Sequence, residues 1–158
     1  MEIIPLHMVP ELGPLLARWS YNEWYRHRSI DFSLVLHTYL ARTKDNSLPQ
    51  SFVAMDEGRP AGMVTLKLDD LWSRKDLNPW LSSLYVVPEA RSRGTGHALV
   101  RTVLARAREL GFASVNLFLG QANMEQLERY YAKRGWEVVG AALDNDGVDT
   151  KIMMFRMG

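Results

Sequence analysis

The strongest constraint on the fold is a strand-like run that leads directly into a glycine-containing turn and a long amphipathic pattern. The run from Trp80 to Val87 (WLSSLYVV) is rich in apolar residues and is stopped by Pro88. The pattern that follows, from Gly94 to Leu110, has its apolar residues at helical spacing, at Leu99, Val100, Val103, Leu104, Ala107 and Leu110. Gly111 is placed as the residue that ends the helix. The sequence therefore predicts a strand, a short loop and a helix in direct succession.

Helix-like and strand-like patterns alternate along the rest of the chain, with no repeat and no linker between two cores. We expect helices over about 10–27, 32–40 and 123–134, short strands at 3–6 and 115–119, and hairpins over 51–68 and 136–155. The hairpins turn at Asp56-Glu57-Gly58 and Asn145-Asp146-Gly147. These patterns predict one domain over residues 1–158, of mixed α/β (α+β) class, with a mostly antiparallel sheet of six to seven strands flanked by about four helices.

Composition excludes several classes of function. Lys plus Arg is 19 and Asp plus Glu is 18, and this near-neutral balance argues against a nucleic-acid-binding protein. The chain has no cysteine, which excludes disulfides and thiolate nucleophiles, and His7, His27 and His37 lack metal-ligand spacing, so we expect no metal. The longest apolar stretch, near Val138 to Leu143, is about six residues, far short of a membrane span. With no signal-peptide pattern at the start, we expect a cytoplasmic location and no membrane partner.

The turn before the long helix has the features of a phosphate site. A helix N-terminus offers unpaired N–H groups and a partial positive charge. Gly94 and Gly96 let a bulky anion approach those groups, and Arg91 and Arg93 add positive charge just ahead of the helix. Together these residues suit a pyrophosphate.

Two common phosphate motifs do not fit this turn. A dinucleotide-binding fingerprint needs a small residue where Leu99 stands, and a P-loop needs Lys-Ser/Thr where His97-Ala98 follow Gly96. The pattern Arg91-x-x-Gly94-x-Gly96, after a strand ending in Val-Val-Pro, instead resembles the acyl-CoA pyrophosphate loop of the GNAT superfamily of N-acetyltransferases.

A second motif strengthens this resemblance. Tyr131 to Trp136 (YAKRGW) follows a strand and a helix and resembles the family's Tyr-x-x-x-Gly-Phe, with Trp in place of Phe. The two motifs stand in the family's order and spacing, and the resemblance covers most of the chain. Trp19 to Trp24 is similar to a segment in the first helix of a bacterial branch of the superfamily.

The resemblance implies acetyl-CoA as co-substrate and a GNAT-like version of the expected sheet. It implies a V-shaped opening between the strand ending at Val87 and the strand Val115–Leu119, in which strand backbone holds the pantetheine arm. The pantetheine-binding backbone would be that of Leu84, Tyr85, Val86 and Val87. The pyrophosphate-binding residues would be Arg91, Ser92, Arg93, Gly94, Thr95, Gly96 and His97.

The resemblance also implies a catalytic acid on the following helix. Tyr131 matches the tyrosine that protonates the departing thiolate, and Tyr130 is the alternative because the helix register is open by one residue. Many relatives have an Asn about seven residues earlier, where this chain has Met124. Asn123 stands one residue early and either contacts the cofactor or is only the N-cap of the helix.

The general base and the acceptor pocket are less defined. Relatives carry a Glu on the strand before the pyrophosphate loop, where this chain has Ser82 and Ser83. Candidate bases are Glu23, Asp69 and Asp70, each of which can instead be an ordinary surface or capping carboxylate. The residues expected to line the acceptor pocket are Glu23, Trp24, Asp70 and Trp72.

The sequence thus predicts an N-acetyltransferase that moves an acetyl group directly to a primary amine of a small molecule or peptide, because no cysteine is present to form an acyl intermediate. The alternative is a non-catalytic GNAT-fold module that binds acyl-CoA and regulates a partner. A homodimer is compatible with the sequence.

Overall fold

The computed structural model describes residues 1–158, and its contacts divide the chain into two compact units. The first unit comprises Met1–Leu66 and Ser83–Val103, and the second comprises Lys67–Ser82 and Leu104–Gly158. None of the helices combines the length and the apolar character that a bilayer crossing requires.

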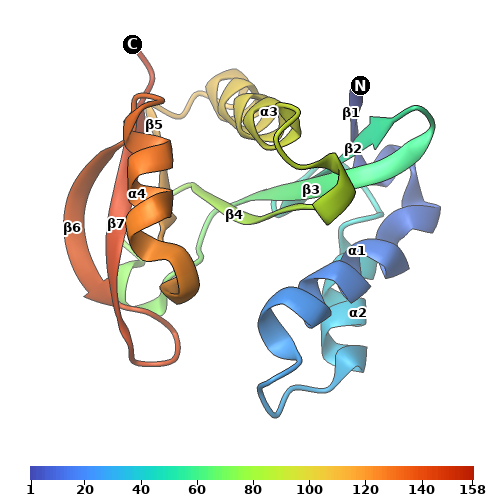
Figure 1. Ribbon diagram of the computed structural model, residues 1–158, viewed down its shortest axis with the longest axis horizontal. Coiled ribbons are helices and arrows are strands. Elements are labelled where there is room, and N and C mark those ends of the chain that lie inside the picture. The colour runs from blue at the N-terminus through green and yellow to red at the C-terminus, as the bar shows by residue number, and fades with distance from the viewer. The chain divides into compact units, whose positions relative to one another are not determined.

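Seven strands hydrogen-bond in the order β1-β2-β3-β4-β5-β7-β6 (Figure 1). Their bounds are Glu2–Pro5 (β1), Gln50–Asp56 (β2), Arg59–Lys67 (β3), Trp80–Val86 (β4), Ser114–Phe118 (β5), Glu137–Leu143 (β6) and Asp149–Arg156 (β7). The pairs β1–β2, β2–β3, β5–β7 and β6–β7 are antiparallel, whereas β4 and β5 are parallel and pair at Trp80 and Asn116. With four α-helices, this confirms the predicted mixed class and the mostly antiparallel sheet.

In the first unit, two helices pack on the antiparallel hairpin β2–β3. They are α1 (Gly13–Ser20) and α2 (Phe32–Ala41), and Asp31 caps α2 by accepting a hydrogen bond from the Ser33 amide at 3.2 Å. The buried core of this unit contains Leu6, Leu16, Ala17, Val35, Tyr39, Val53 and Met63. The single helix expected over 10–27 is wrong in detail, because α1 is followed by a π-helical turn over Tyr21–Tyr25.

The turn of the β2–β3 hairpin lies where the sequence predicts it. Glu57 and Gly58 both have positive φ, 51° and 76°. Two central residues of this kind give a turn whose twist matches that of the flanking strands. The predicted hairpin is therefore confirmed.

The second unit contains strands β5, β6 and β7 and helix α4 (Met124–Ala132). Trp80 is fully buried with Leu71 and Ile152, and its ring meets Phe118 at 6.1 Å between centroids. Between β3 and β4 the chain makes one 3-10 turn, Trp72–Arg74.

Helix α3 (Thr95–Glu109) contains residues of both units. Its predicted apolar stripe is buried at Leu99, Val100, Val103 and Ala107. Leu110 is 42% exposed, so its assignment to the stripe is wrong. The helix ends at Glu109, so Leu110 lies outside it, and Gly111, with a φ of 88°, turns the chain away directly afterwards.

Candidate functional site

The turn between β4 and α3 carries a run of amide groups without acceptors. After Val87 the chain makes one 3-10 turn and enters α3 at Thr95, with left-handed backbone at Ser92 (φ 65°) and Gly94 (φ 84°). The N–H groups of residues 92–97 donate no hydrogen bond within the protein, and the first paired amide is that of Ala98, which donates to the Gly94 carbonyl at 3.0 Å. These free donors lie at the positive end of a 15-residue helix, which suits an anion.

Two arginines flank this turn. The Arg91 Nε donates to the Val86 carbonyl at 2.9 Å, and its guanidinium lies 5.8 Å from the centroid of the Tyr85 ring. Arg93 Nη1 is 3.9 Å from Asp56 Oδ2, with side-chain exposures of 66% and 33%. An ion pair this long and this exposed is weak, so Arg93 can turn toward another anion at little cost. Arg91 is fixed against β4 and keeps its Nη donors free.

Strand β4 contains a backbone irregularity that the sequence does not reveal. Ser83 has a φ of 54°, in the left-handed region that non-glycine residues avoid at a cost of about 1–2 kcal/mol. The five residues from Ser82 to Val86 are all half-buried, in place of the usual alternation along a strand. Such irregularities in strands recur beside functional sites, because they redirect side chains and free backbone groups.

The hydrogen bonds around Val87 limit which of its backbone groups can bind pantetheine. The Val87 amide donates to the Ala61 carbonyl at 2.9 Å, and the Val87 carbonyl accepts from the Ala90 amide at 2.9 Å. The Val87 amide is therefore not free to donate to pantetheine, while its carbonyl can accept a second hydrogen bond, so the expected contact at Val87 stays a prediction. The expectation for Leu84–Val86 stays a prediction.

Gly62 of β3 lets β4 and α3 approach closely. A Cβ atom built at this position would lie 2.7 Å from the Tyr85 carbonyl oxygen and 3.1 Å from the Leu99 Cδ1. No side chain can be added without moving backbone. This contact belongs to the first unit and supports the strand on which the pantetheine prediction rests; nothing in the sequence pattern distinguishes Gly62 from an ordinary hairpin glycine.

The two candidate tyrosines lie on α4 in the second unit. Tyr131 is 6% exposed, and its ring meets Tyr130 and Trp136 edge-on, at 5.2 and 5.6 Å between centroids. Burial, with a smaller contribution from Tyr130, raises the pKa of the Tyr131 phenol above its usual value. Tyr130 is half-buried, with the Arg134 guanidinium 3.7 Å from its ring centroid. A neutral, buried phenol and a half-buried one stand side by side, and either can donate a hydrogen bond.

Asn123 stands at the N-cap position of α4, but its side chain makes no capping hydrogen bond. It ends a 3-10 turn over Gln121–Asn123 and is exposed. The capping interpretation of Asn123 therefore describes its place in the chain and not its side-chain bonding.

The residues expected around the acceptor fall into two groups. Glu23 and Trp24 lie together in the π-helical turn of the first unit, and both are exposed. Asp70 and Trp72 lie together in the second unit, where Asp70 forms an ion pair of 3.0 Å with Lys67. Because this pairing occupies the Asp70 carboxylate, Asp70 is a weaker base candidate than Glu23.

Trp72 is 70% exposed, yet its backbone is anchored. Its amide donates to Asn145 Oδ1 at 3.0 Å, and Asn145 Nδ2 donates to the Asp70 carbonyl at 2.9 Å. Ser73 Oγ donates to the Leu143 carbonyl at 3.0 Å. The loop after β3 is thus fastened to the β6–β7 turn, and it presents an indole to solvent on a fixed backbone.

Sequence reasoning also missed Asn116 of β5. The side chain is 1% exposed, its Nδ2 and its backbone amide both donate to the Pro79 carbonyl, and its Oδ1 has no partner. A buried amide within the apolar run VNLFL was the available signal.

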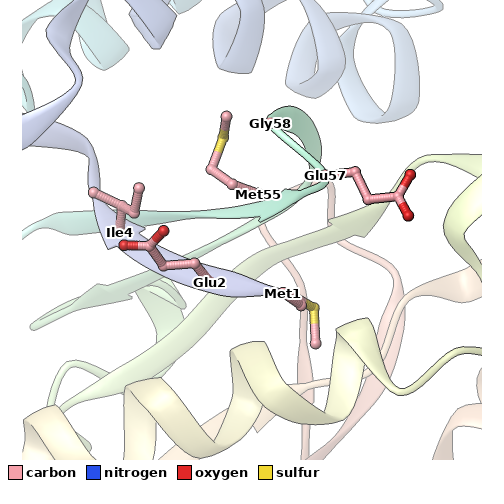
Figure 2. A pocket seen from close by; sticks show the side chains of 6 residues that line it. All are labelled: Met1, Glu2, Ile4, Met55, Glu57 and Gly58. Atoms are coloured by element: carbon pink, nitrogen blue, oxygen red, sulfur yellow. The ribbon is translucent and has the colours of Figure 1, made fainter.

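A surface cavity of about 430 Å³ lies elsewhere in the first unit (Figure 2). It is lined by Met1, Glu2, Ile4, Met55, Glu57 and Gly58, at the end of β1 and the β2–β3 turn. None of the residues expected to bind the co-substrate or the acceptor, or to act in catalysis, lines it.

Comparison with known proteins gives a consistent family. The model of the acetyltransferase (GNAT) family matches residues 14–136. Uncharacterized N-acetyltransferases from Mycobacterium tuberculosis and Mycobacterium bovis are 34% identical over 87 residues, which cover 55% of this chain and 52% of theirs. The chain therefore spans about half the length of the curated relatives it matches.

Solved structures share the fold over 69% to 99% of the chain. An aminoglycoside 6'-N-acetyltransferase complexed with coenzyme A is 15% identical, with a TM-score of 0.75 over 99% of this chain and 97% of its own. A nourseothricin acetyltransferase is 26% identical, with a TM-score of 0.56 over 69% of this chain and 65% of its own.

Proposed function

The chain belongs to the acetyltransferase (GNAT) family, and on this premise we propose that it transfers the acetyl group of acetyl-CoA to a primary amine of a small molecule or a peptide. The observation that carries the proposal is the run of unpaired amides over residues 92–97 at the start of α3. The coenzyme A in the aminoglycoside acetyltransferase structure adds support for acetyl-CoA as the co-substrate.

The turn fits the diphosphate of such a co-substrate. Six consecutive amides without acceptors can each donate to a phosphate oxygen, and the helix end adds a partial positive charge. Arg93 is nearly free, and Arg91 is held beside Tyr85, so both can contribute charge-assisted bonds. Residues 91–97 would therefore hold the diphosphate, and the backbone of Leu84–Val86 would hold the pantetheine arm.

Acetyl-CoA, when bound, supplies an activated thioester. In the overall transfer a C–N bond forms, the C–S bond breaks, the amine loses a proton and the thiolate gains one. An amine with a pKa near 10.4 costs roughly 4–5 kcal/mol to deprotonate at pH 7. The protein must therefore position the amine, lower the cost of its deprotonation and provide a proton donor.

We assign the donor to Tyr131, with Tyr130 as the alternative. Because burial raises the pKa of Tyr131, its phenol stays protonated at neutral pH and can donate to a developing thiolate. Tyr130 is half-buried and is therefore less shielded from water than Tyr131, which is 6% exposed. Tyr131 is therefore the better permanent donor.

We assign the acceptor-binding residues of the first unit to Glu23 and Trp24, whose side chains are exposed, and Trp72 of the second unit stays a prediction. A carboxylate beside an indole attracts a cationic amine. Since β4 has serines where relatives carry Glu, and Asp70 pairs with Lys67, Glu23 and the exposed Asp69 remain as base candidates.

Gly94→Glu tests the co-substrate site. The new side chain must adopt left-handed backbone and places a negative charge among the donors, so acetyl-CoA binding measured by calorimetry should fall at least about tenfold. Gly111→Glu is the matched control, because Gly111 also has positive φ and open space at the other end of the same helix. A Gly94→Glu protein that binds acetyl-CoA like the control would refute the assignment.

A non-catalytic acyl-CoA-binding module is the second candidate, favoured by the absence of a carboxylate in β4. CoA release with a panel of amines decides between them. For an enzyme, Tyr131→Phe should lower turnover about a hundredfold with little change in acetyl-CoA affinity, and Tyr130→Phe should not. For a module, no amine supports CoA release and neither variant changes anything measurable.

A further inference from the structure

Buried polar residues gather at one place in the first unit, apart from the turn described above. Of the eight buried polar or charged residues of the protein, four are Arg42, Gln50, Ser51 and Thr65. Arg42 follows the last residue of α2, and the other three lie where β2 begins and β3 ends. Ser51 and Thr65 are directly opposite each other in the β2–β3 ladder.

Neutral groups surround the Arg42 guanidinium. Its Nη1 donates to Ser51 Oγ and to Thr65 Oγ1, each at 3.2 Å, and the two hydroxyls are 2.7 Å apart. Its Cζ lies 4.5 Å from the centroid of the Tyr39 ring. Two hydroxyls and a ring face orient the guanidinium but do not neutralise it.

The cluster has donors in excess and no acid. No carboxylate oxygen lies within 4.0 Å of a nitrogen of the Arg42 guanidinium. The Arg42 Nε and the Tyr39 hydroxyl are buried without partners. The partial negative charge at the end of α2 is a small compensation. A buried cation without a counter-ion is unfavourable, so we infer that an anion from outside the protein pairs with this guanidinium.

We propose that Arg42 is the centre of an anion-binding site that takes a carboxylate. Nε and Nη2 share one edge of the planar guanidinium, and neither makes a hydrogen bond in the protein. That edge accepts a carboxylate through two parallel hydrogen bonds, and the bonds from Nη1 hold the group in place for it. Arg42 keeps 9% of its surface exposed, and because Nε itself is buried, the ligand would have to enter from the Nη2 side of the guanidinium.

The chemistry favours a carboxylate over a phosphate group. The site offers one full positive charge, and its other members, Tyr39, Ser51 and Thr65, are neutral. A singly charged planar group matches this charge, whereas a phosphate dianion would remain half uncompensated in a buried place. The proposal is independent of acetyl transfer.

Formate is the probe, and the Arg side-chain Nε–H resonances in a ¹⁵N-labelled protein are the readout. Titration with sodium formate should give a saturable shift of the Arg42 Nε–H signal, and sodium chloride at equal ionic strength should not. The signal is assigned by its absence in Arg42→Lys. Arg59, which is exposed in the same unit, is the internal control. An Arg42 signal that does not move, or that moves only as Arg59 does or as strongly in chloride, overturns the proposal.

Thermal unfolding gives a second readout. Formate should raise the melting temperature of the wild type more than chloride does, and Arg42→Met should abolish that difference. Equal formate effects on both proteins would overturn the site. Should Arg42→Met fail to fold, Tyr39→Phe keeps the guanidinium and removes only the unpaired hydroxyl. It should still fold and should bind formate more weakly, and unchanged formate affinity would contradict the role of Tyr39.

The source of the carboxylate follows from kinetics. Formate that competes with the amine acceptor indicates that the acceptor itself carries the carboxylate. Formate that binds without affecting the acceptor KM indicates a separate effector. A failure to observe acetyl transfer leaves the resonance and melting experiments unaffected, so the two proposals fail separately.

Discussion

Replacing Gly62 with alanine tests whether β4 is held in place by close packing. The added Cβ would stand 2.7 Å from the Tyr85 carbonyl oxygen, and an ordinary contact begins at about 3.4 Å. The oxygen must therefore move by about 0.7 Å, and it is a backbone atom that cannot move alone. Leu99 Cδ1, at 3.1 Å, can adjust by side-chain rotation, so the Tyr85 contact is the decisive one.

Two opposing contributions set the size of the effect. Forcing one extra carbon into a packed region costs about 1–3 kcal/mol. Against this, alanine reduces the freedom of the unfolded chain and contributes about 0.4–1 kcal/mol of stability. We expect a net loss of about 1–2 kcal/mol in the free energy of unfolding at Gly62→Ala. For a chain of this length that corresponds to a melting temperature lower by about 2–8 °C.

Differential scanning calorimetry measures the melting temperature, and Gly120→Ala is the control. Gly120 has φ −68° and ψ 145°, which alanine adopts readily, and its Cβ would meet only Leu127 Cδ1, at 4.0 Å. This control should melt at or slightly above the wild-type temperature. Acetyl-CoA affinity should also fall in Gly62→Ala, because the displaced carbonyl belongs to the predicted pantetheine edge. A Gly62→Ala protein as stable as Gly120→Ala would refute the packing argument.

Two further predictions follow from single contacts. Burial raises the pKa of Tyr131 in the folded state, so its contribution to the free energy of unfolding is complete below about pH 10 and is lost above it, where the unfolded chain ionises first. Urea unfolding at about pH 9 and pH 11 should therefore show a smaller loss of stability for Tyr131→Phe than for the wild type. Equal losses of stability would contradict the burial argument. Asn145→Ala removes the hydrogen bonds to the Trp72 amide and the Asp70 carbonyl, so hydrogen exchange of the Trp72 amide should accelerate and the free energy of unfolding should fall by about 1–2 kcal/mol. Unchanged hydrogen exchange at Trp72 would show that other contacts hold the loop.

The parts of the fold that the sequence predicted are those fixed by local chemistry. The β2–β3 turn needs two residues with positive φ, and Glu57-Gly58 between two β-rich runs is a strong local signal. The buried face of α3 follows from the spacing of Leu99, Val103 and Ala107, and its end follows from Gly111. At the candidate site, the glycines before α3 predicted a turn with exposed amides for the same reason.

Features that depend on contacts distant in sequence were not predictable. Ser83 is an ordinary strand residue in the sequence, and only the surroundings of β4 hold it at a φ of 54°. The π-helical turn at Tyr21–Tyr25 leaves the apolar spacing of a helix almost unchanged, so the periodicity of apolar residues cannot distinguish it from an α-helix. The pairing of Val87 with Ala61 depends on the register of two strands, which the pattern of either strand alone does not specify.

The contacts of Gly62, Ser83 and Val87 with residues distant in sequence all involve strand β4 or the residue that follows it. They explain how a strand whose own sequence shows no unusual pattern can have a specific backbone geometry. Gly62 lets the strand pack closely at Tyr85, Val87 pairs with Ala61 of β3 just after the strand ends, and the Ser83 backbone departs from regular geometry earlier in the strand. A residue held in an unfavourable conformation persists only where its surroundings overdetermine it. The packing at Gly62 therefore acts on the same strand as Ser83, and the proposed co-substrate edge depends on a glycine that is not expected to contact the co-substrate.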